Sequence, residues 1–195
     1  MEPILPAWTE SHAVLVPVKA FGEAKLRLAP ALSPGERRRL ARTMATQVVR
    51  SAAGLPAAVV CDDTEVAQWA RSLGALVIWE PGRGLNGAVE EGVRRLGLMG
   101  VESVVVAAGD LPLATDLRWV TEFDGITLVP DRRRDGTNVI CVPVGIGFTF
   151  SYGPGSFSRH LAEANRLGTP VRVVHSSPLA WDVDLPEDLT VVVQQ

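Results

Sequence analysis

The hydrophobic pattern divides the chain into short apolar runs separated by amphipathic stretches. Apolar runs without strict alternation are typical of strands that are covered on both faces, and the intervening stretches carry apolar residues at helical spacing. We expect strands at 13–18, 57–61, 75–79, 104–108, 126–129, 138–144 and 171–175. We expect helices from Ser33 to about Gly54, over 62–74, from the turn at 81–86 to Leu98, over 115–123 and 156–167, and from Pro186 onward.

Strand and helix alternate strictly as far as residue 129, which favours a mostly parallel central sheet flanked by helices. The chain has 195 residues, of which 47% are hydrophobic, and this suits one α/β domain with one core. We therefore expect a single domain over 1–195, with residues 1–12 as a loosely ordered arm. The arm contains acidic residues and prolines and does not resemble a secretion signal.

Charge, apolar run length and cysteine spacing indicate which binding partners and which cellular compartment the sequence favours. The net charge of −3 gives no overall attraction to nucleic acid or to an anionic membrane, and no apolar run is long enough to cross a bilayer. Cys61 and Cys141 match no metal-binding or redox spacing, so we expect reduced core cysteines in a cytoplasmic protein. The only two lysines, Lys19 and Lys25, both fall in the loop expected after the first strand.

The apolar run at 104–108 stops at Gly109 and Asp110, and Pro112 prevents its continuation. Open α/β sheets bind ligands at the carboxyl ends of central strands, which is where Asp110 is expected. A second acidic feature is the pair Asp182 and Asp184, whose side chains point the same way on an extended segment. Together the three carboxylates are hard oxygen ligands suited to Mg²⁺. The competing interpretation is that Asp110 caps a turn and the pair caps the last helix.

Basic and glycine-rich loops suggest where phosphates would bind. Lys19 and Lys25 follow the first strand, where a lysine acts as a mobile charge on phosphate, although a solvated loop fits equally well. Asn86 ends a glycine turn that would let backbone approach a base or ribose, or that simply connects strand to helix. The stretch 132–134 is three arginines, which we expect to be a solvated basic loop.

The segment 153–156 places two glycines and Ser156 at the start of an expected helix, where exposed amides bind phosphate or carboxylate. Capping by Ser156 explains the same residues. Thr137, beside Gly136, lies where a loop re-enters the sheet.

Common nucleotide and hydrolase fingerprints are missing. No Gly-x-Gly-x-x-Gly follows the first strand, and neither a P-loop nor a Gly-x-Ser-x-Gly elbow occurs. The sequence thus disfavours a dinucleotide dehydrogenase, a P-loop enzyme and an α/β hydrolase.

In their order along the chain, six segments resemble the guanylyltransferases that activate 2-phospho-L-lactate or phosphoenolpyruvate in the synthesis of the deazaflavin coenzyme F420. They extend over residues 13–189: Val16-Pro17-Val18-Lys19 with Ala24-Lys25-x-Arg27-Leu28, Gly84-Leu85-Asn86-x-Ala88-Val89, Gly109-Asp110-Leu111-Pro112-Leu113, Gly136-Thr137-Asn138, Gly153-Pro154-Gly155-Ser156-Phe157 and Asp182-Val183-Asp184-x-Pro186-Glu187-Asp188-Leu189.

The resemblance implies a Rossmann-like nucleotidyltransferase fold and Mg²⁺-dependent transfer of GMP from GTP to the acceptor, with release of pyrophosphate. It assigns roles to three sets of residues. Asp110, Asp182 and Asp184 are the catalytic metal ligands; Thr137, Gly153 and Ser156 contact the acceptor; Lys19, Lys25 and Asn86 contact the nucleotide. It also suggests that the product passes to a downstream transferase.

The expected chemistry fits these residue types. Phosphoryl transfer depends mainly on positioning and charge neutralisation, and a phosphate acceptor needs no general base. We prefer phosphoenolpyruvate as the acceptor because the arginine- and alanine-rich composition points to a high-GC bacterium, for which the resemblance implies the phosphoenolpyruvate variant. Two alternatives remain: another Mg²⁺-dependent nucleotidyltransferase (molybdopterin or sugar-phosphate type) or glycosyltransferase with an Asp-x-Asp site, and a nucleotide-binding module without catalysis.

Overall fold

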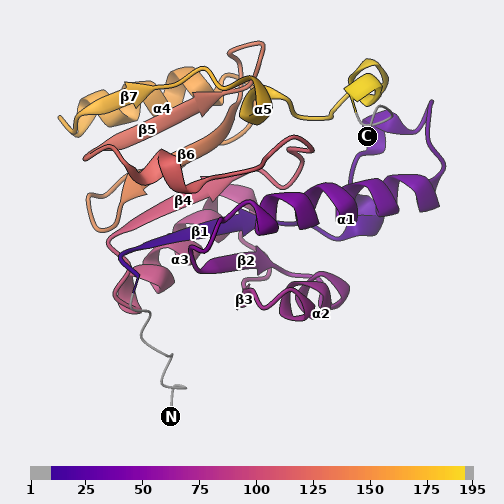
Figure 1. Ribbon diagram of the computed structural model, residues 1–195, viewed down its shortest axis with the longest axis horizontal. Helices are drawn as coiled ribbons and strands as arrows, with labels where there is room; N and C mark the ends of the chain where they lie inside the picture. Colours follow the sequence, from indigo (N-terminus) through magenta and orange to yellow (C-terminus); the bar gives the residue numbers. More distant parts are fainter. Residues whose placement is uncertain (1–9, 192–195) are drawn as a thin grey trace.

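The computed structural model describes residues 10–191, which form a seven-stranded sheet with helices on both faces (Figure 1). The strand order is β3-β2-β1-β4-β6-β5-β7, and in Figure 1 the sheet climbs from β3 at the bottom to β7 at the top. Among the described strands only β6 is antiparallel to its neighbours, β4 and β5. The mostly parallel α/β fold expected from the sequence is therefore confirmed.

All seven expected strands are present, with small shifts at their ends. They are β1 (His12–Pro17), β2 (Ala57–Cys61), β3 (Leu76–Trp79), β4 (Ser103–Ala107), β5 (Ile126–Pro130), β6 (Thr137–Pro143) and β7 (Val171–Val173). Most of the arm expected over residues 1–12 lies outside the described residues, and His12 belongs to β1.

The α-helices are α1 (Pro34–Arg50), α2 (Thr64–Ser72), α3 (Gly84–Leu98), α4 (Ser156–Arg166) and the short α5 (Ser177–Ala180). Their starts follow local chemistry. Ser33 and Glu36 form a reciprocal capping box in front of α1, with Pro34 as the first helical residue. The Asp63 side chain accepts a hydrogen bond from the Val66 amide and caps α2.

Alternate residues of each strand face opposite helical layers. In β4, Val105 and Ala107 pack in the core shared with α1 and α2, whereas Val104 and Val106 pack in the core shared with α3 and α4. A strand buried on both faces has no polar alternation, which is why the run at 104–108 is continuously apolar.

Two expected helices are wrong. The stretch 115–123 contains only a 3₁₀ turn, η3 (Arg118–Thr121), and the chain from Pro186 forms the 3₁₀ segment η4 (Pro186–Val191). Before η3 the backbone bonds to α1 and its C-cap instead of to itself: the Leu117 amide donates to the Ser51 carbonyl and the Gln47 side chain to the Ala114 carbonyl. Tertiary partners therefore replace the helical ones. Helix α5 was not expected, and α1 ends at Arg50, short of Gly54.

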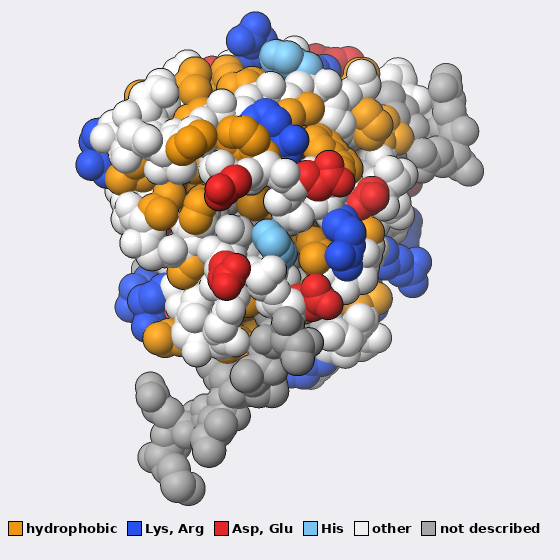
Figure 2. All heavy atoms as spheres, turned by 60° about the vertical axis from the view of Figure 1, so that its left-hand side comes forward, with side chains coloured by type: hydrophobic (Ala, Val, Ile, Leu, Met, Phe, Trp, Pro, Cys, Tyr) orange, Lys and Arg blue, Asp and Glu red, His pale blue; other side chains and the backbone are white. Residues whose placement is uncertain are grey.

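The face of the molecule turned forward in Figure 2 mixes acidic, basic and apolar side chains. On the described part of that face the basic side chains form no continuous patch, in keeping with a net charge of −3. Within residues 10–191, no helix combines the length and the hydropathy needed to cross a bilayer.

Candidate active site

Two loops meet at the carboxyl edge of the sheet, because β1 and β4 are parallel neighbours and end at the same side. The loop after β1 carries Lys19 and Lys25, and the loop after β4 carries Asp110. The two loops pass close together at Gly109, where a Cβ would lie 3.4 Å from the Pro17 carbonyl oxygen, about van der Waals contact. The structure thus places Asp110 at the end of a central strand, as the sequence predicted.

A third segment reaches this edge from the C-terminal end of the described chain. Val183 is buried in a small apolar cluster with Leu28 and Met44, which come from the loop after β1 and from α1. In Figure 1 this yellow segment lies beside the loop that precedes α1. Because Val183 stands between Asp182 and Asp184, burying it brings Asp184 to Lys25, while Asp182 lies 4.0 Å from the Arg132 guanidinium.

Lys25 links two of the three carboxylates. Its Nζ lies 2.5 Å from Asp110 Oδ2 and 3.0 Å from Asp184 Oδ1. The Lys25 side chain is only 10% exposed, and its backbone is left-handed, with φ of 57°. A non-glycine residue in that region is held there by its surroundings. The more exposed Arg27 lies 3.8 Å from Asp184.

The charges of this cluster are only partly balanced. Burial would lower the pKa of Lys25, but Asp110 and Asp184 outweigh it and raise the pKa above its ordinary value. Burial raises the pKa of Asp182, and the negative charges of Asp110 and Asp184 raise it further. Asp110 and Asp184 therefore share one buried ammonium, while Asp182 Oδ1 lies 4.0 Å from the Arg132 guanidinium, and the remaining negative charge favours a further cation.

Within residues 10–191, no three His, Cys, Asp or Glu side chains are placed as they stand to hold a metal ion. Mg²⁺ usually takes only one or two carboxylates and fills its other positions with water and phosphate. Asp110 and Asp184 meet that smaller requirement, because both bond to the same Lys25 nitrogen. Carboxylate oxygens are also the hard donors that Mg²⁺ prefers.

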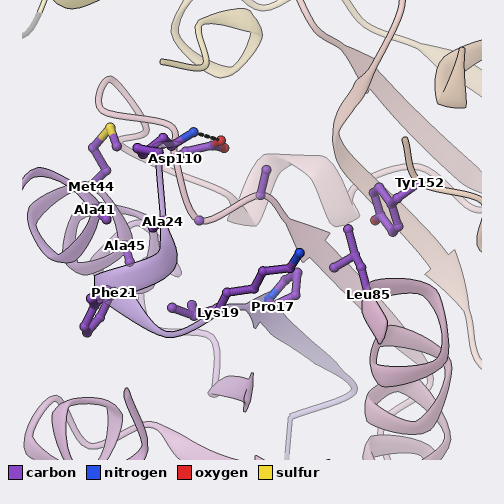
Figure 3. Close-up of a pocket in the computed structure, with 14 residues that line it drawn as sticks. Pro17, Lys19, Phe21, Ala24, Ala41, Met44, Ala45, Leu85, Asp110 and Tyr152 are labelled. Atoms are coloured by element: carbon purple, nitrogen blue, oxygen red, sulfur yellow. Dashed lines mark hydrogen bonds and ion pairs between the residues drawn. The ribbon is translucent and has the colours of Figure 1, made fainter. Parts of the chain in front are cut away.

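A pocket of about 210 Å³ opens beside this cluster (Figure 3). Asp110, which pairs with Lys25, lies at one end, Leu85 and Tyr152 lie at the other, and Lys19 extends toward Leu85. A second pocket, of about 280 Å³, shares Lys19 and Leu85 and continues over the ends of β2 and β3. Lys19 therefore stands between two adjoining spaces at the carboxyl edge of the sheet.

The remaining predicted residues hold the loop 151–156 in place. The Asn86 Oδ1 atom accepts a hydrogen bond from the Tyr152 amide at 2.7 Å. The Ser156 hydroxyl accepts one from the Thr137 amide at 3.0 Å, and both residues are buried. The exposed Gly153 has φ of 112°, which favours glycine. These four predicted residues thus meet around one loop, whose Tyr152 lines the pocket.

His160 completes the loop support from α4. Its Nε2 accepts from the Ser151 amide at 2.9 Å, so its Nδ1 carries the proton and donates to the Thr137 hydroxyl at 3.0 Å. Burial, with a contribution from Arg159, lowers the pKa of His160 to about 4. No motif around His160 predicts this role from the sequence.

The alternative interpretation, in which Asp110, Asp182 and Asp184 only cap a turn or a helix, does not match their contacts. Asp110 bonds to Lys25, and the side chain that caps the turn at 184–185 is that of Asp188, which accepts from both amides. The expected solvated arginine loop is wrong for Arg132. This side chain is only 24% exposed and pairs with Asp188.

The fold is that of the nucleotidyltransferases. A nucleotidyl transferase from Methanothermobacter thermautotroptrophicus matches with a TM-score of 0.70 and 20% identity, over 93% of this chain and 95% of that chain. A CMP:2-keto-3-deoxy-manno-octonic acid synthetase complexed with CTP matches with a TM-score of 0.60 and 12% identity, over 94% and 97% of the two chains.

The sequence places the chain more narrowly. Residues 12–194 match the family described as "Guanylyl transferase CofC like", and the chain belongs to that family. A phosphoenolpyruvate guanylyltransferase from Rubrobacter xylanophilus is 39% identical, over 90% of each chain. Another from Sphaerobacter thermophilus is 34% identical, over 90% of this chain and 89% of the relative. The resemblance inferred from six short segments is confirmed.

Proposed function

We propose that this chain transfers GMP from GTP to phosphoenolpyruvate and releases pyrophosphate, as a step in the synthesis of the deazaflavin coenzyme F420. The observation that carries the proposal is the cluster at the carboxyl edge, where Lys25 joins Asp110 to Asp184 beside a pocket. The names of the relatives supply the substrates.

The reaction needs charge neutralisation more than proton transfer. A phosphate oxygen of the acceptor forms a bond to the α-phosphorus of GTP, and the bond from that phosphorus to the bridging β-phosphate oxygen breaks. The electron pair leaves with pyrophosphate. Because the acceptor phosphate is already ionised at neutral pH, no side chain has to remove a proton.

We assign the polyanion to the basic loop after β1. Lys25 and Lys19 provide positive charge at the end of the pocket near Asp110 and at the junction of the two pockets, respectively. Asp110 and Asp184, with Asp182 beside them, would hold Mg²⁺. When bound, Mg²⁺ would neutralise phosphate charge and orient the triphosphate for in-line attack. The acceptor then lies toward the loop 151–156, whose position Asn86, Thr137 and Ser156 maintain.

The test is pyrophosphate release over a matrix of nucleotides and acceptors. GTP, ATP, CTP and UTP are each combined with phosphoenolpyruvate, 2-phospho-L-lactate and a sugar 1-phosphate, with and without Mg²⁺. We expect the highest rate for GTP with phosphoenolpyruvate and Mg²⁺. A faster reaction with phospholactate would change the acceptor, and a reaction confined to the sugar phosphate would overturn the proposal.

The phosphoanhydride product is chemically activated, which fits direct transfer to a downstream enzyme in a cytoplasmic pathway. Product release measured with and without that enzyme tests the transfer: faster turnover with it supports hand-over, and unchanged turnover contradicts it.

A further inference from the structure

The segment that carries Asp182 and Asp184 has no regular structure of its own. It lies between α5, which ends at Ala180, and η4, which begins at Pro186. A strand or helix fixes the direction of its side chains through backbone hydrogen bonds, but this segment must obtain that order from elsewhere. Besides the burial of Val183, the polar contacts that supply it come from two charged residues, Arg132 and Asp188.

Asp188 holds the segment from its C-terminal side. Its Oδ2 accepts from the amides of Asp184 and Leu185, at 2.9 and 2.8 Å. The side chain is 1% exposed. A neutral acceptor would satisfy two amides, whereas a buried carboxylate also requires a positive partner.

Arg132 is that partner, and it reaches from the loop after β5. Its guanidinium pairs with Asp188 Oδ1 and also donates to the Asp182 carbonyl at 3.1 Å. Its central carbon lies 4.3 Å from the centre of the Trp181 ring, so the side chain stacks on the segment. The Arg132 amide donates to the Ala180 carbonyl at 3.0 Å. The neighbouring Arg133 is 3.8 Å from Asp188 and half-exposed.

We infer that Arg132 and Asp188 are positioning residues, which set the direction of the Asp182 and Asp184 carboxylates toward Asp110 and the cation they would share. The inference rests on the metal role given to these carboxylates in the proposed function. Arg132 fixes the backbone of Asp182 and Asp188 fixes that of Asp184, so the pair acts on both carboxylates. Partners that orient ligands in this way commonly contribute ~10–100-fold to metal affinity.

The experiment compares Arg132→Met, Arg132→Lys and Asp188→Asn with wild type and a control. The control is Arg38→Met. It removes the ion pair between Arg38 of α1 and Glu65 of α2, neither of which contacts Asp182 or Asp184, and the Arg38 side chain is exposed. Each protein is titrated with Mn²⁺ without substrate by electron paramagnetic resonance, its melting temperature is recorded, and kcat and KM are measured.

We expect Arg132→Met to weaken Mn²⁺ binding ~10-fold or more and to lower kcat more than it raises KM for GTP. Arg132→Lys and Asp188→Asn should have intermediate effects, because Lys keeps the charge and Asn keeps an acceptor for the amides. Arg38→Met should leave Mn²⁺ binding unchanged. If Arg132→Met does not fold, the two conservative variants carry the comparison.

Mn²⁺ affinity and kcat within twofold of wild type, with only a lower melting temperature, would overturn the inference and leave the pair a stabilising contact. A wild-type chain that does not bind Mn²⁺ would overturn it together with the metal assignment. An error in the acceptor would appear in the substrate matrix alone and would leave the Mn²⁺ comparison intact.

Discussion

The charged cluster around Lys25 and the hydrogen-bonded network around His160 differ in whether every polar group has a partner. At the first site Lys25 is shared by Asp110 and Asp184, and burial together with these two negative charges raises the pKa of Asp182. At the second, His160 has a partner on each ring nitrogen, and Asn86 and Ser156 each accept from a backbone amide. Charged groups with shifted pKa values are typical of catalytic sites, whereas polar groups whose hydrogen bonds are all made typically stabilise the structure.

The largest expected effect is on the charged site. Asp110→Asn should lower turnover roughly 10²–10³-fold, because it removes a charge that would stabilise the transition state through the cation. We expect little change in the melting temperature. Steady-state pyrophosphate release and thermal unfolding measure the two quantities.

The matched control for that variant is Asp116→Asn, an exposed carboxylate further along the same connection that bonds to the Arg118 amide. It should retain turnover. Full activity of Asp110→Asn would contradict the metal assignment and favour a nucleotide-binding module.

The second prediction concerns acid stability of the neutral site. His160 has an ordinary pKa of 6.5, lowered to about 4 by burial, so the unfolded chain binds its proton first as the pH falls. The resulting stability is complete above pH 6.5 and is lost between 6.5 and about 4, by about 3 kcal/mol. Urea unfolding at several pH values measures this slope.

His160→Asn should be less stable at pH 7 and should lose less stability on acidification, whereas the exposed His175→Asn should retain the wild-type slope. An unchanged slope in His160→Asn would show that the acid sensitivity lies elsewhere.

The third prediction separates support from binding at Asn86. Asn86→Ala should cost about 1–2 kcal/mol of unfolding free energy, because it leaves the Tyr152 amide without its acceptor. Asn86→Asp keeps an acceptor oxygen and loses the amide donor. Restored stability with a raised KM for GTP would show that Asn86 also contacts the nucleotide, and restoration of both would limit it to holding the loop.

The smallest expected effect is an increase in stability at the charged site, whereas the substitutions in the network around His160 should lower stability. Asp182→Asn removes a charge that folding disfavours, so it should raise the unfolding free energy at pH 7 by less than about 1 kcal/mol while lowering turnover. Because the folded pKa is raised, the gain should shrink in acid as Asp182 becomes protonated. Calorimetry at pH 7 and pH 4 measures it, and a loss of stability at pH 7 would contradict the repulsion.

The sequence alone determined the sheet strands and most helices, because burial on two faces and helix caps leave local signals. The run at 104–108 predicted a central strand with Asp110 at its end, and Ser33 predicted the start of the first helix. The wrong helix at 115–123 is one where hydrogen bonds to a distant segment replace helical ones, and after Pro186 the chain forms only 3₁₀ structure while Asp188 pairs with the distant Arg132. Local pattern contains no information about such partners.

Only the tertiary structure decided which of the predicted residues lie at the charged site and which hold the loop 151–156 in place. Residue types and spacing nominated Lys25, Asp110 and Asp184, but only the burial of Val183 against Leu28 and Met44 brings Asp184 to Lys25, 159 residues earlier in the chain. Asn86, Thr137 and Ser156, assigned by resemblance to substrates, lie in a network that supports a loop. The sequence predicted no positioning role for Arg132 or Asp188, because an ion pair between residues 56 positions apart produces no recognisable pattern in either segment. Polar groups acquire their function from partners that folding brings together, whereas apolar periodicity is visible before the chain folds.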